Sequence, residues 1–267
     1  MATKIGAGKK SWITRRKKEK ALRNKLAQAG FKSWETRWAN KKKAEILSTL
    51  PQKKEKGYVV KERKNKERIT KHKATTYKNL GIKKGNGLFL LSKTLNDVKV
   101  INEVIPNNNI HFITAEKDEI ARETIRRRNK EEKLNIELYG YCIGQVIKDS
   151  PKNSLVIGDI DLCTVFSSAL PIVYNALTKD IFKVGAPLSF TFDTRDGGIR
   201  RLAIDLGLKN LDELSKQKGG LIIPVLLAYF KKIGGDKWKI IYQPEIYSDS
   251  DSGAGANMVF VMLQRVK

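Results

Sequence analysis

Two aspartates, Asp159 and Asp161, follow directly after the apolar run Leu155–Ile157 and Gly158. A continuous run of apolar, β-branched residues is typical of a strand that is covered on both faces, as in a parallel sheet. Carboxylates just beyond such a strand lie at its carboxyl end, where open α/β sheets bind their ligands. There a carboxylate can orient a nucleophile or accept its proton, so both aspartates are candidate catalytic residues. The alternative is a solvated turn after a core strand.

Another carboxylate, that of Glu116, directly follows the apolar run Ile110–Ala115, for which we also predict a strand. In that position its two oxygens could accept hydrogen bonds from the paired hydroxyls of a diol. The alternative is a helix-capping role beside Asp118 and Glu119, because acidic residues are favoured in the first turn of a helix.

Strand and helix patterns alternate from Gly81 onward and would position these carboxylates. The predicted strands are 87–91, 110–115, 135–139, 155–157, 187–193, 238–242 and 258–263. The predicted helices are 94–105, 118–133, 144–148, 171–183, 211–216 and 222–233. Strands separated by helix-length connections indicate an α/β fold with a doubly wound, mostly parallel sheet, here of seven strands. No helix separates the last two strands, which should form an antiparallel hairpin.

The charge of this 267-residue chain is concentrated in its first third. The whole chain carries 53 Lys and Arg against 28 Asp and Glu, a net charge of +25. Residues 1–80 hold 26 basic and 6 acidic residues, whereas residues 81–267 hold 27 and 22. This asymmetry predicts a basic arm over 1–80 and a sheet domain over 81–267. Such an excess of positive charge indicates a nucleic-acid partner before an anionic membrane.

The arm contains a short internal repeat, in which Lys10–Arg15 recurs as Lys32–Arg37. Serine in each copy can cap a helix, which predicts helices at about 12–29 and 34–50. Their apolar stripes are thin, so we expect the pair to become ordered against a polyanion. A solvated tail and a nuclear-import signal are the alternatives. The predicted nucleic-acid-binding residues of the arm are Arg15, Arg16, Lys17, Lys18, Lys41, Lys42 and Lys43.

Composition argues against several other classes of protein. With only Cys142 and Cys163, no disulfide framework is expected, and a reducing compartment such as the cytoplasm is indicated, or the host cytoplasm or virion if the protein is viral. Only His72 and His111 could supply imidazole ligands, so we expect no structural zinc site. No apolar run approaches the roughly 18 residues needed to span a bilayer.

The order of these elements, with acids after the second and fourth strands and a closing hairpin, resembles the class I S-adenosylmethionine-dependent methyltransferases over about 81–267. The resemblance implies that Glu116 holds the ribose hydroxyls, that Tyr141 or Cys142 contacts adenine, and that Asp159, Asp161 and Leu162 line the transfer site. The residues implied to bind the cofactor are Leu91, Ser92, Glu116, Lys117, Tyr141, Cys142 and Asp159. The segment Phe190–Arg195 looks like the fifth-strand motif of some phage and viral methyltransferase-like proteins. Within it, Arg195 could contact phosphate or form a salt bridge with Asp193.

The chain departs from this family at its first turn, where Ser92–Leu95 contains no glycine, while Gly85 and Gly87 lie at the opposite, amino end of the predicted strand. The favoured function is S-adenosylmethionine-dependent methylation of DNA or RNA, with the arm holding the polyanion. The alternative is a catalytically inactive methyltransferase-like protein that binds nucleic acid or serves, with protein partners, as an assembly or structural component of a phage or viral nucleoprotein particle.

Overall fold

The computed structural model describes residues 64–91, 95–105, 109–217, 219–248 and 257–267. The basic residues Arg15–Lys18 and Lys41–Lys43 and both predicted arm helices lie outside the described residues, as does Ser92. The described residues belong to one compact unit, which spans Glu62–Lys267.

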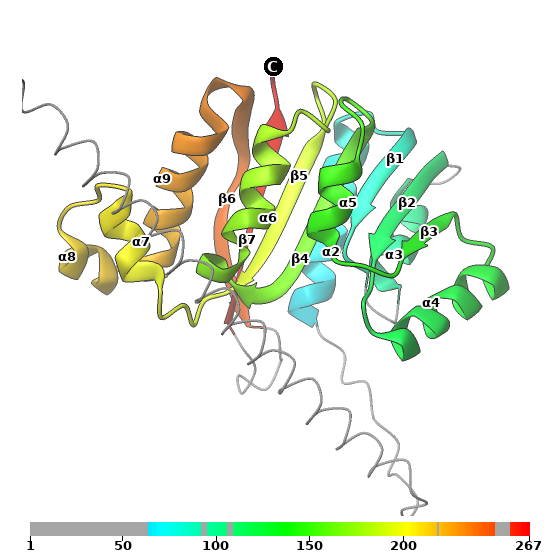
Figure 1. The fold of residues 1–267 in the computed structure, drawn as a ribbon, viewed down its shortest axis with the longest axis horizontal. Coiled ribbons are helices and arrows are strands. Elements are labelled where there is room, and N and C mark those ends of the chain that lie inside the picture. The colour runs from blue at the N-terminus through cyan, green and yellow to red at the C-terminus, as the bar shows by residue number, and fades with distance from the viewer. Residues whose placement is uncertain (1–63, 92–94, 106–108, 218, 249–256) are drawn as a thin grey trace, which may run out of the picture. The chain divides into compact units, whose positions relative to one another are not determined.

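Seven strands form one sheet in the order β3-β2-β1-β4-β5-β7-β6 (Figure 1). They are β1 (Lys84–Phe89), β2 (Asn109–Ala115), β3 (Ile136–Tyr139), β4 (Leu155–Val165), β5 (Pro187–Asp193), β6 (Trp238–Ser248) and β7 (Asn257–Arg265). The first five run parallel to one another, and β7 pairs antiparallel with both β5 and β6. This arrangement confirms the predicted doubly wound α/β sheet with a closing antiparallel hairpin.

Helices cover both faces of the sheet and enclose two apolar cores (Figure 1). One face is covered by α2 (Lys64–Asn79), α3 (Asn96–Val104) and α4 (Glu119–Glu131). The other is covered by α5 (Ile143–Asp149), α6 (Phe166–Thr178) and α9 (Ile222–Gly234). Between β5 and β6 the chain also forms α7 (Ile199–Asp205), α8 (Leu211–Lys216) and the short 3-10 helix η1 (Gly235–Lys237). Of these, α7 was not predicted from the sequence.

Helix α2 corrects the predicted domain boundary at residue 80. Its charge made it look like part of the arm, yet it packs on the sheet with Ile69, Ala74 and Tyr77 buried. Two polar residues of the same face, Thr70 and Lys73, are buried with them. The boundary drawn from the charge distribution was wrong because the basic residues of α2 pair with acids of the sheet domain that lie far away in the sequence. With the unit starting at Glu62, residues 1–61 keep 19 basic and 4 acidic residues.

Strand β4 is longer than predicted, so Asp159 and Asp161 lie inside it rather than beyond it. Glycine was expected to end the strand at Gly158, but the strand continues because it pairs with β1 and β5 on its two sides. Glycine stands there because the site has no room for a side chain. A Cβ at Gly158 would lie 2.6 Å from Leu188 Cδ1 and 2.7 Å from Phe182 Cε1. Replacement by any larger residue would therefore force the packing at the centre of the sheet to shift.

Strand β1 also begins earlier than predicted, so that Gly85 and Gly87 lie within it. A Cβ at Gly87 would lie 2.5 Å from the ring of Phe89 and 2.8 Å from Ile157 Cγ2. This glycine therefore serves the packing of the sheet and not a ligand.

Helix α6 begins before the predicted start at Pro171, which lies inside it. The buried face of Phe166, Ala169 and Val173 extends the apolar pattern toward the N-terminus, and tertiary packing of this face outweighs the missing N–H of the proline.

Candidate functional site

The strand order reverses between β1 and β4, which makes this point of the carboxyl edge the topological switch point where open α/β sheets bind ligands. Backbone hydrogen bonds hold the edge together: Leu90 N donates to Asp159 O at 3.0 Å and Glu116 N donates to Tyr139 O at 3.0 Å. Four adjacent strands thus bring Leu91, Glu116 and the segment after Tyr139 to one edge.

Glu116 follows the last residue of β2 and is half-buried. Its Oε1 accepts a hydrogen bond from Asp118 N at 2.8 Å, and Asp118 in turn caps α4 by accepting from Ala121 N at 2.7 Å. The bond from Asp118 N uses one of the roughly four lone pairs that the Glu116 carboxylate offers. Glu116 therefore supports the start of α4 and can still accept hydrogen bonds from a ligand.

Arg122 on α4 ties together the two loops that flank this carboxylate. Its Nη1 donates to the carbonyl oxygens of Lys117 at 2.9 Å, Glu116 at 3.3 Å and Gly140 at 3.5 Å. Sequence reasoning missed this residue, because its partners follow β2 and β3 and lie together only in the folded chain. Its buried Nε has no hydrogen-bond partner among the described residues.

The loop after β3 presents an aromatic surface beside Glu116. Tyr141 is 38% exposed, and its ring lies against that of Tyr139 with centroids 5.1 Å apart. Tyr139 is held by a 2.5 Å hydrogen bond from its hydroxyl to Glu137 Oε1, which raises its pKa to about 12. Cys142 is exposed at the N-cap of α5. An exposed tyrosine ring of this kind can stack on a nucleobase.

The first turn of the predicted cofactor site is only partly described. Leu91 is buried, and its N–H donates to Thr114 Oγ1 at 3.3 Å. Leu95 adopts a left-handed backbone conformation with φ of 53° and is fully buried. A left-handed leucine costs of order 1–2 kcal/mol, so its burial must fix the turn that a glycine usually makes.

Asp159, a predicted catalytic residue, is 4% exposed and is fully engaged by other side chains of the protein. Both of its carboxylate oxygens accept from Lys73 Nζ on α2, at 2.9 and 2.8 Å, and Oδ1 also accepts from Ser189 Oγ at 2.7 Å. The hydroxyl of Tyr77 lies 3.3 Å from the same serine oxygen. This geometry corrects the prediction, since a carboxylate held beneath α2 serves the docking of that helix rather than contact with a substrate.

Lys73 is the buried cation of this cluster. Burial lowers the pKa of its ammonium, but the carboxylate of Asp159 more than offsets that effect, with smaller contributions from Asp97 and Asp161, so the pKa is raised above 10.5. The Lys73 ammonium also lies 5.5 Å from the centroid of the Phe260 ring. Lys73 therefore stays charged and links α2 to the centre of the sheet.

Asp161 points to the same face two residues further along β4. Its carboxylate is 14% exposed and lies 2.9 Å from Lys66 Nζ, also on α2. Lys66 and Lys73 are two helical turns apart, so they lie on one side of the helix and match the two aspartates of the strand. Asp161 remains the more accessible of the two predicted catalytic residues.

The charged residues after β5 form ion pairs and hydrogen bonds within the protein. The guanidinium of Arg195 binds Asp193 through Nε at 3.0 Å and Nη2 at 2.5 Å, which lowers the pKa of Asp193. This ion pair confirms the salt-bridge alternative. The next acid, Asp196, accepts from the backbone and hydroxyl of Ser167 at 2.7 and 2.6 Å and so caps α6 from a distant loop.

Among the described residues, no group of three or more His, Cys, Asp or Glu is placed to hold a metal ion. No helix in the described part of the chain is both long and apolar enough to cross a membrane.

Comparison with known proteins gives a result at the level of fold. No protein-family model matches this chain, and no curated protein matches its sequence. A structure assigned as an O-methyltransferase from Klebsiella pneumoniae superposes with a TM-score of 0.51 at 11% identity, covering 84% of this chain and 96% of its own. This chain has a methyltransferase-like fold.

Two more structures superpose less closely. A protein assigned as a sarcosine dimethylglycine methyltransferase from Galdieria sulphuraria has a TM-score of 0.49 at 12% identity, covering 76% of this chain and 88% of its own. The O-methyltransferase from Bacillus cereus in complex with SAH has a TM-score of 0.48 at 12% identity, covering 84% and 88%. At these identities the comparison concerns the fold, so the activity must be argued from the site.

Proposed function

We propose that this protein is an S-adenosylmethionine-dependent methyltransferase that acts on nucleic acid. The observation that carries the proposal is that Glu116 follows β2 and the exposed ring of Tyr141 follows the neighbouring β3, at the carboxyl edge of a methyltransferase-like sheet. Glu116 would accept hydrogen bonds from the ribose hydroxyls, and Tyr141 would cover the adenine. The bound cofactor would supply an activated methyl group on its sulfonium.

The nucleic-acid substrate is supported by charge. Residues 1–61 hold 19 basic and 4 acidic residues, and the compact unit adds 34 against 24. Lys and Arg in this excess bind a phosphate backbone by releasing its counterions. Asp161 would face the nucleophile of the substrate, with Lys66 holding its carboxylate in place. Asp159 would act indirectly by fixing α2.

The proposal predicts that Glu116→Ala weakens S-adenosylmethionine binding roughly ten- to a hundredfold, because hydrogen bonds to a charged acceptor contribute about 1.5–3 kcal/mol. Isothermal titration calorimetry on the full chain measures this. The matched control is Glu119→Ala, which removes an exposed acid in the first turn of α4, three residues after Glu116. This variant should bind S-adenosylmethionine normally. Unchanged affinity of the Glu116 variant, with thermal stability preserved in both, would contradict the assignment.

The proposal also predicts that Asp161→Asn lowers the rate of methyl transfer roughly a hundredfold or more while leaving cofactor affinity unchanged, as expected for a group that orients or deprotonates the nucleophile. The assay is transfer of labelled methyl from S-adenosylmethionine to mixed DNA and RNA. Asp149→Asn, which removes an exposed carboxylate that accepts from Gln145, is the control. Equal incorporation by the wild type and the Asp161 variant would remove this residue from the reaction.

A second function is favoured by a specific observation. The acid at the centre of β4 is neutralised by Lys73, and the first turn has a buried leucine in place of a flexible glycine. A methyltransferase-like protein that binds nucleic acid without transferring methyl groups would tolerate both features. Absence of cofactor binding by the wild type would favour this function.

A further inference from the structure

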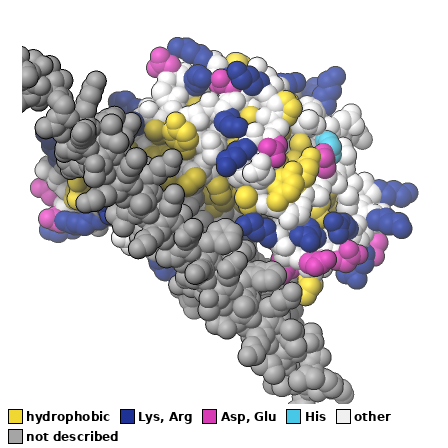
Figure 2. Space-filling model, in the orientation of Figure 1, with side chains coloured by type: hydrophobic (Ala, Val, Ile, Leu, Met, Phe, Trp, Pro, Cys, Tyr) yellow, Lys and Arg dark blue, Asp and Glu magenta, His cyan; other side chains and the backbone are white. Residues whose placement is uncertain are grey.

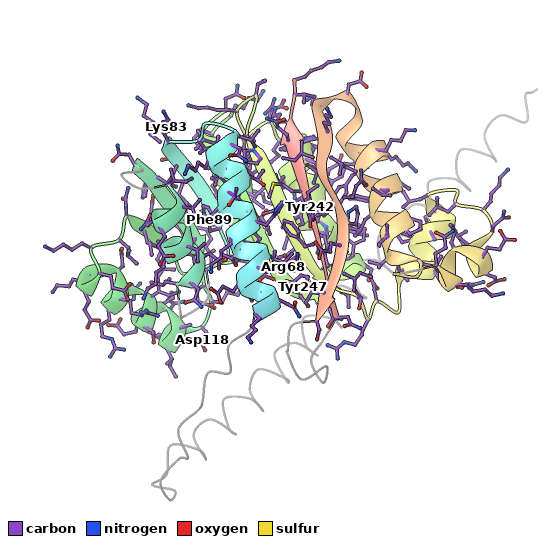
Figure 3. All side chains as sticks on the ribbon, turned by 180° about the vertical axis from the view of Figure 1, so that it is seen from behind. Arg68, Lys83, Phe89, Asp118, Tyr242 and Tyr247 are labelled. Atoms are coloured by element: carbon purple, nitrogen blue, oxygen red, sulfur yellow. The ribbon has the colours of Figure 1, made fainter. Side chains whose placement is uncertain are left out.

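Exposed lysines gather at the amino edge of the sheet, which lies opposite the candidate cofactor site. Figure 3 places Lys83 at this edge and Asp118 at the opposite one, and in Figure 2 dark-blue side chains follow the upper margin, where the amino ends of the strands lie in Figure 1. The exposed lysines of the amino edge lie within four residues of the ends of the adjacent strands from β1 to β6: Lys83, Lys84, Lys152, Lys183, Lys237, Lys239 and Lys267.

Two acids near the amino edge, Asp180 and Asp236, are held by basic residues of the protein. Asp180 is bound by Lys237 at 2.9 Å and by Arg265 at 3.0 Å, and Asp236 lies 3.6 Å from Lys267. Four other lysines of this edge make no ion pair with any described residue: Lys83, Lys84, Lys183 and Lys239. Their charges are therefore uncompensated by neighbours in the compact unit.

Three basic side chains toward the carboxyl edge are held by acids. Lys66 pairs with Asp161, Arg195 pairs with Asp193, and Arg68 pairs with Glu245. The same sheet thus carries internally paired charges at the edge with the candidate cofactor site and unpaired positive charges at the other. An unpaired row of like charges raises the local potential and attracts a polyanion.

We propose that the amino edge is a second nucleic-acid-binding surface, which contacts the sugar–phosphate backbone. Four inter-strand spacings separate β1 from β6, so the row is about 19 Å long, which matches several consecutive phosphates. Lysine ammonium groups on flexible stems suit phosphates at variable positions and carry no base specificity. The inference rests on the nucleic-acid partner of the proposed function but is independent of methyl transfer.

An anionic membrane is a weaker match to this surface. The exposed apolar residues at the amino edge are Val184 and Val266, 64% and 41% exposed. Membrane-surface proteins insert bulky residues such as Trp, Phe or Leu, and two valines supply little apolar area. Nucleic acid, which needs only the charges, is the better partner.

The test compares Lys83→Ala/Lys183→Ala/Lys239→Ala with the wild-type full chain. The probes are a labelled 20-nucleotide single-stranded RNA and a DNA duplex of the same length, titrated at several salt concentrations. Removal of three phosphate contacts should reduce the slope of log Kobs against log salt by about 2 on RNA. The control Arg126→Ala/Arg127→Ala/Lys130→Ala removes three exposed charges from α4, where acids pair with both arginines, and its slope should change by much less.

Equal slopes for the wild type and the amino-edge variant would overturn the inference, as would failure of the wild type to bind either probe. Loss of binding to vesicles that contain phosphatidylserine, with RNA binding intact, would also overturn it in favour of a membrane. Calorimetry with S-adenosylmethionine separates the two proposals. A reduced salt slope in the amino-edge variant, without cofactor binding by the wild type, would support the amino edge as a nucleic-acid-binding surface and contradict the methyltransferase proposal. Cofactor binding with equal salt slopes would support the methyltransferase proposal and contradict the amino-edge surface.

Discussion

Lys73→Met is expected to lower the free energy of unfolding by about 3–5 kcal/mol, the usual cost of removing one partner from a buried ion pair. The change leaves the Asp159 carboxyl, which is 4% exposed, buried beneath an apolar side chain without its cation. Because small domains are stable by only about 5–15 kcal/mol, this is a large fraction of the total. Urea denaturation followed by circular dichroism measures the loss. It would show that α2 is part of the folded unit.

Two variants define the origin of this effect. Lys73→Met/Asp159→Asn removes the uncompensated charge and should recover a good part of the stability. Lys71→Met, on the exposed face of the same helix, removes a surface pair with Glu67 and should cost less than about 0.5 kcal/mol. Equal unfolding free energies of the Lys73→Met and Lys71→Met variants would contradict the conclusion that Lys73 and Asp159 form a buried ion pair.

The pH dependence of the Lys73 effect has a defined sign. The folded-state pKa of this lysine is raised above its ordinary value of 10.5 by Asp159. Its stabilising contribution is therefore complete below pH 10.5 and is lost as the pH rises toward the folded-state pKa. The wild type should lose this contribution above about pH 10.5, so its stability advantage over Lys73→Met should shrink there. A difference that grows at high pH would contradict this linkage.

Neutralising the arm should produce the largest loss of nucleic-acid affinity. Seven alanine substitutions remove two basic runs of the arm: Arg15, Arg16, Lys17, Lys18, Lys41, Lys42 and Lys43. With about 0.7 counterions released per phosphate on a single strand, the salt slope should fall by about 5 units and the affinity near 0.1 M salt by at least a thousandfold. Fluorescence anisotropy with the single-stranded RNA measures both quantities.

The control for the arm is the α4 variant with three alanines, which should change the slope by less than half a unit. Folding of the compact unit should be unaffected in both variants, and thermal unfolding checks this. Similar slopes in the seven-alanine variant and the wild type would show that the arm is not where the polyanion binds, and would leave the amino edge as the surface to examine.

The amino-acid sequence by itself determined the order and type of most elements from β1 to β7. Alternation of short β-branched runs with amphipathic segments is a local property, and each element buries the face that its own periodicity defines. The same local logic placed Glu116 at the end of β2 and Tyr141 after β3. A residue that follows a parallel strand reaches the ligand-binding edge whatever the rest of the chain does.

The tertiary structure decided which charges meet. Lys73 and Asp159 are 86 residues apart, and nothing near either one indicates that a helix rich in Lys and Arg would lie over β4. The helix docks because its lysines find carboxylates on that face and its apolar residues complete the core, a choice made by packing rather than by local propensity. Likewise, Gly158 continues a strand that local rules would end, since only the packed neighbours Leu188 and Phe182 make a side chain impossible there.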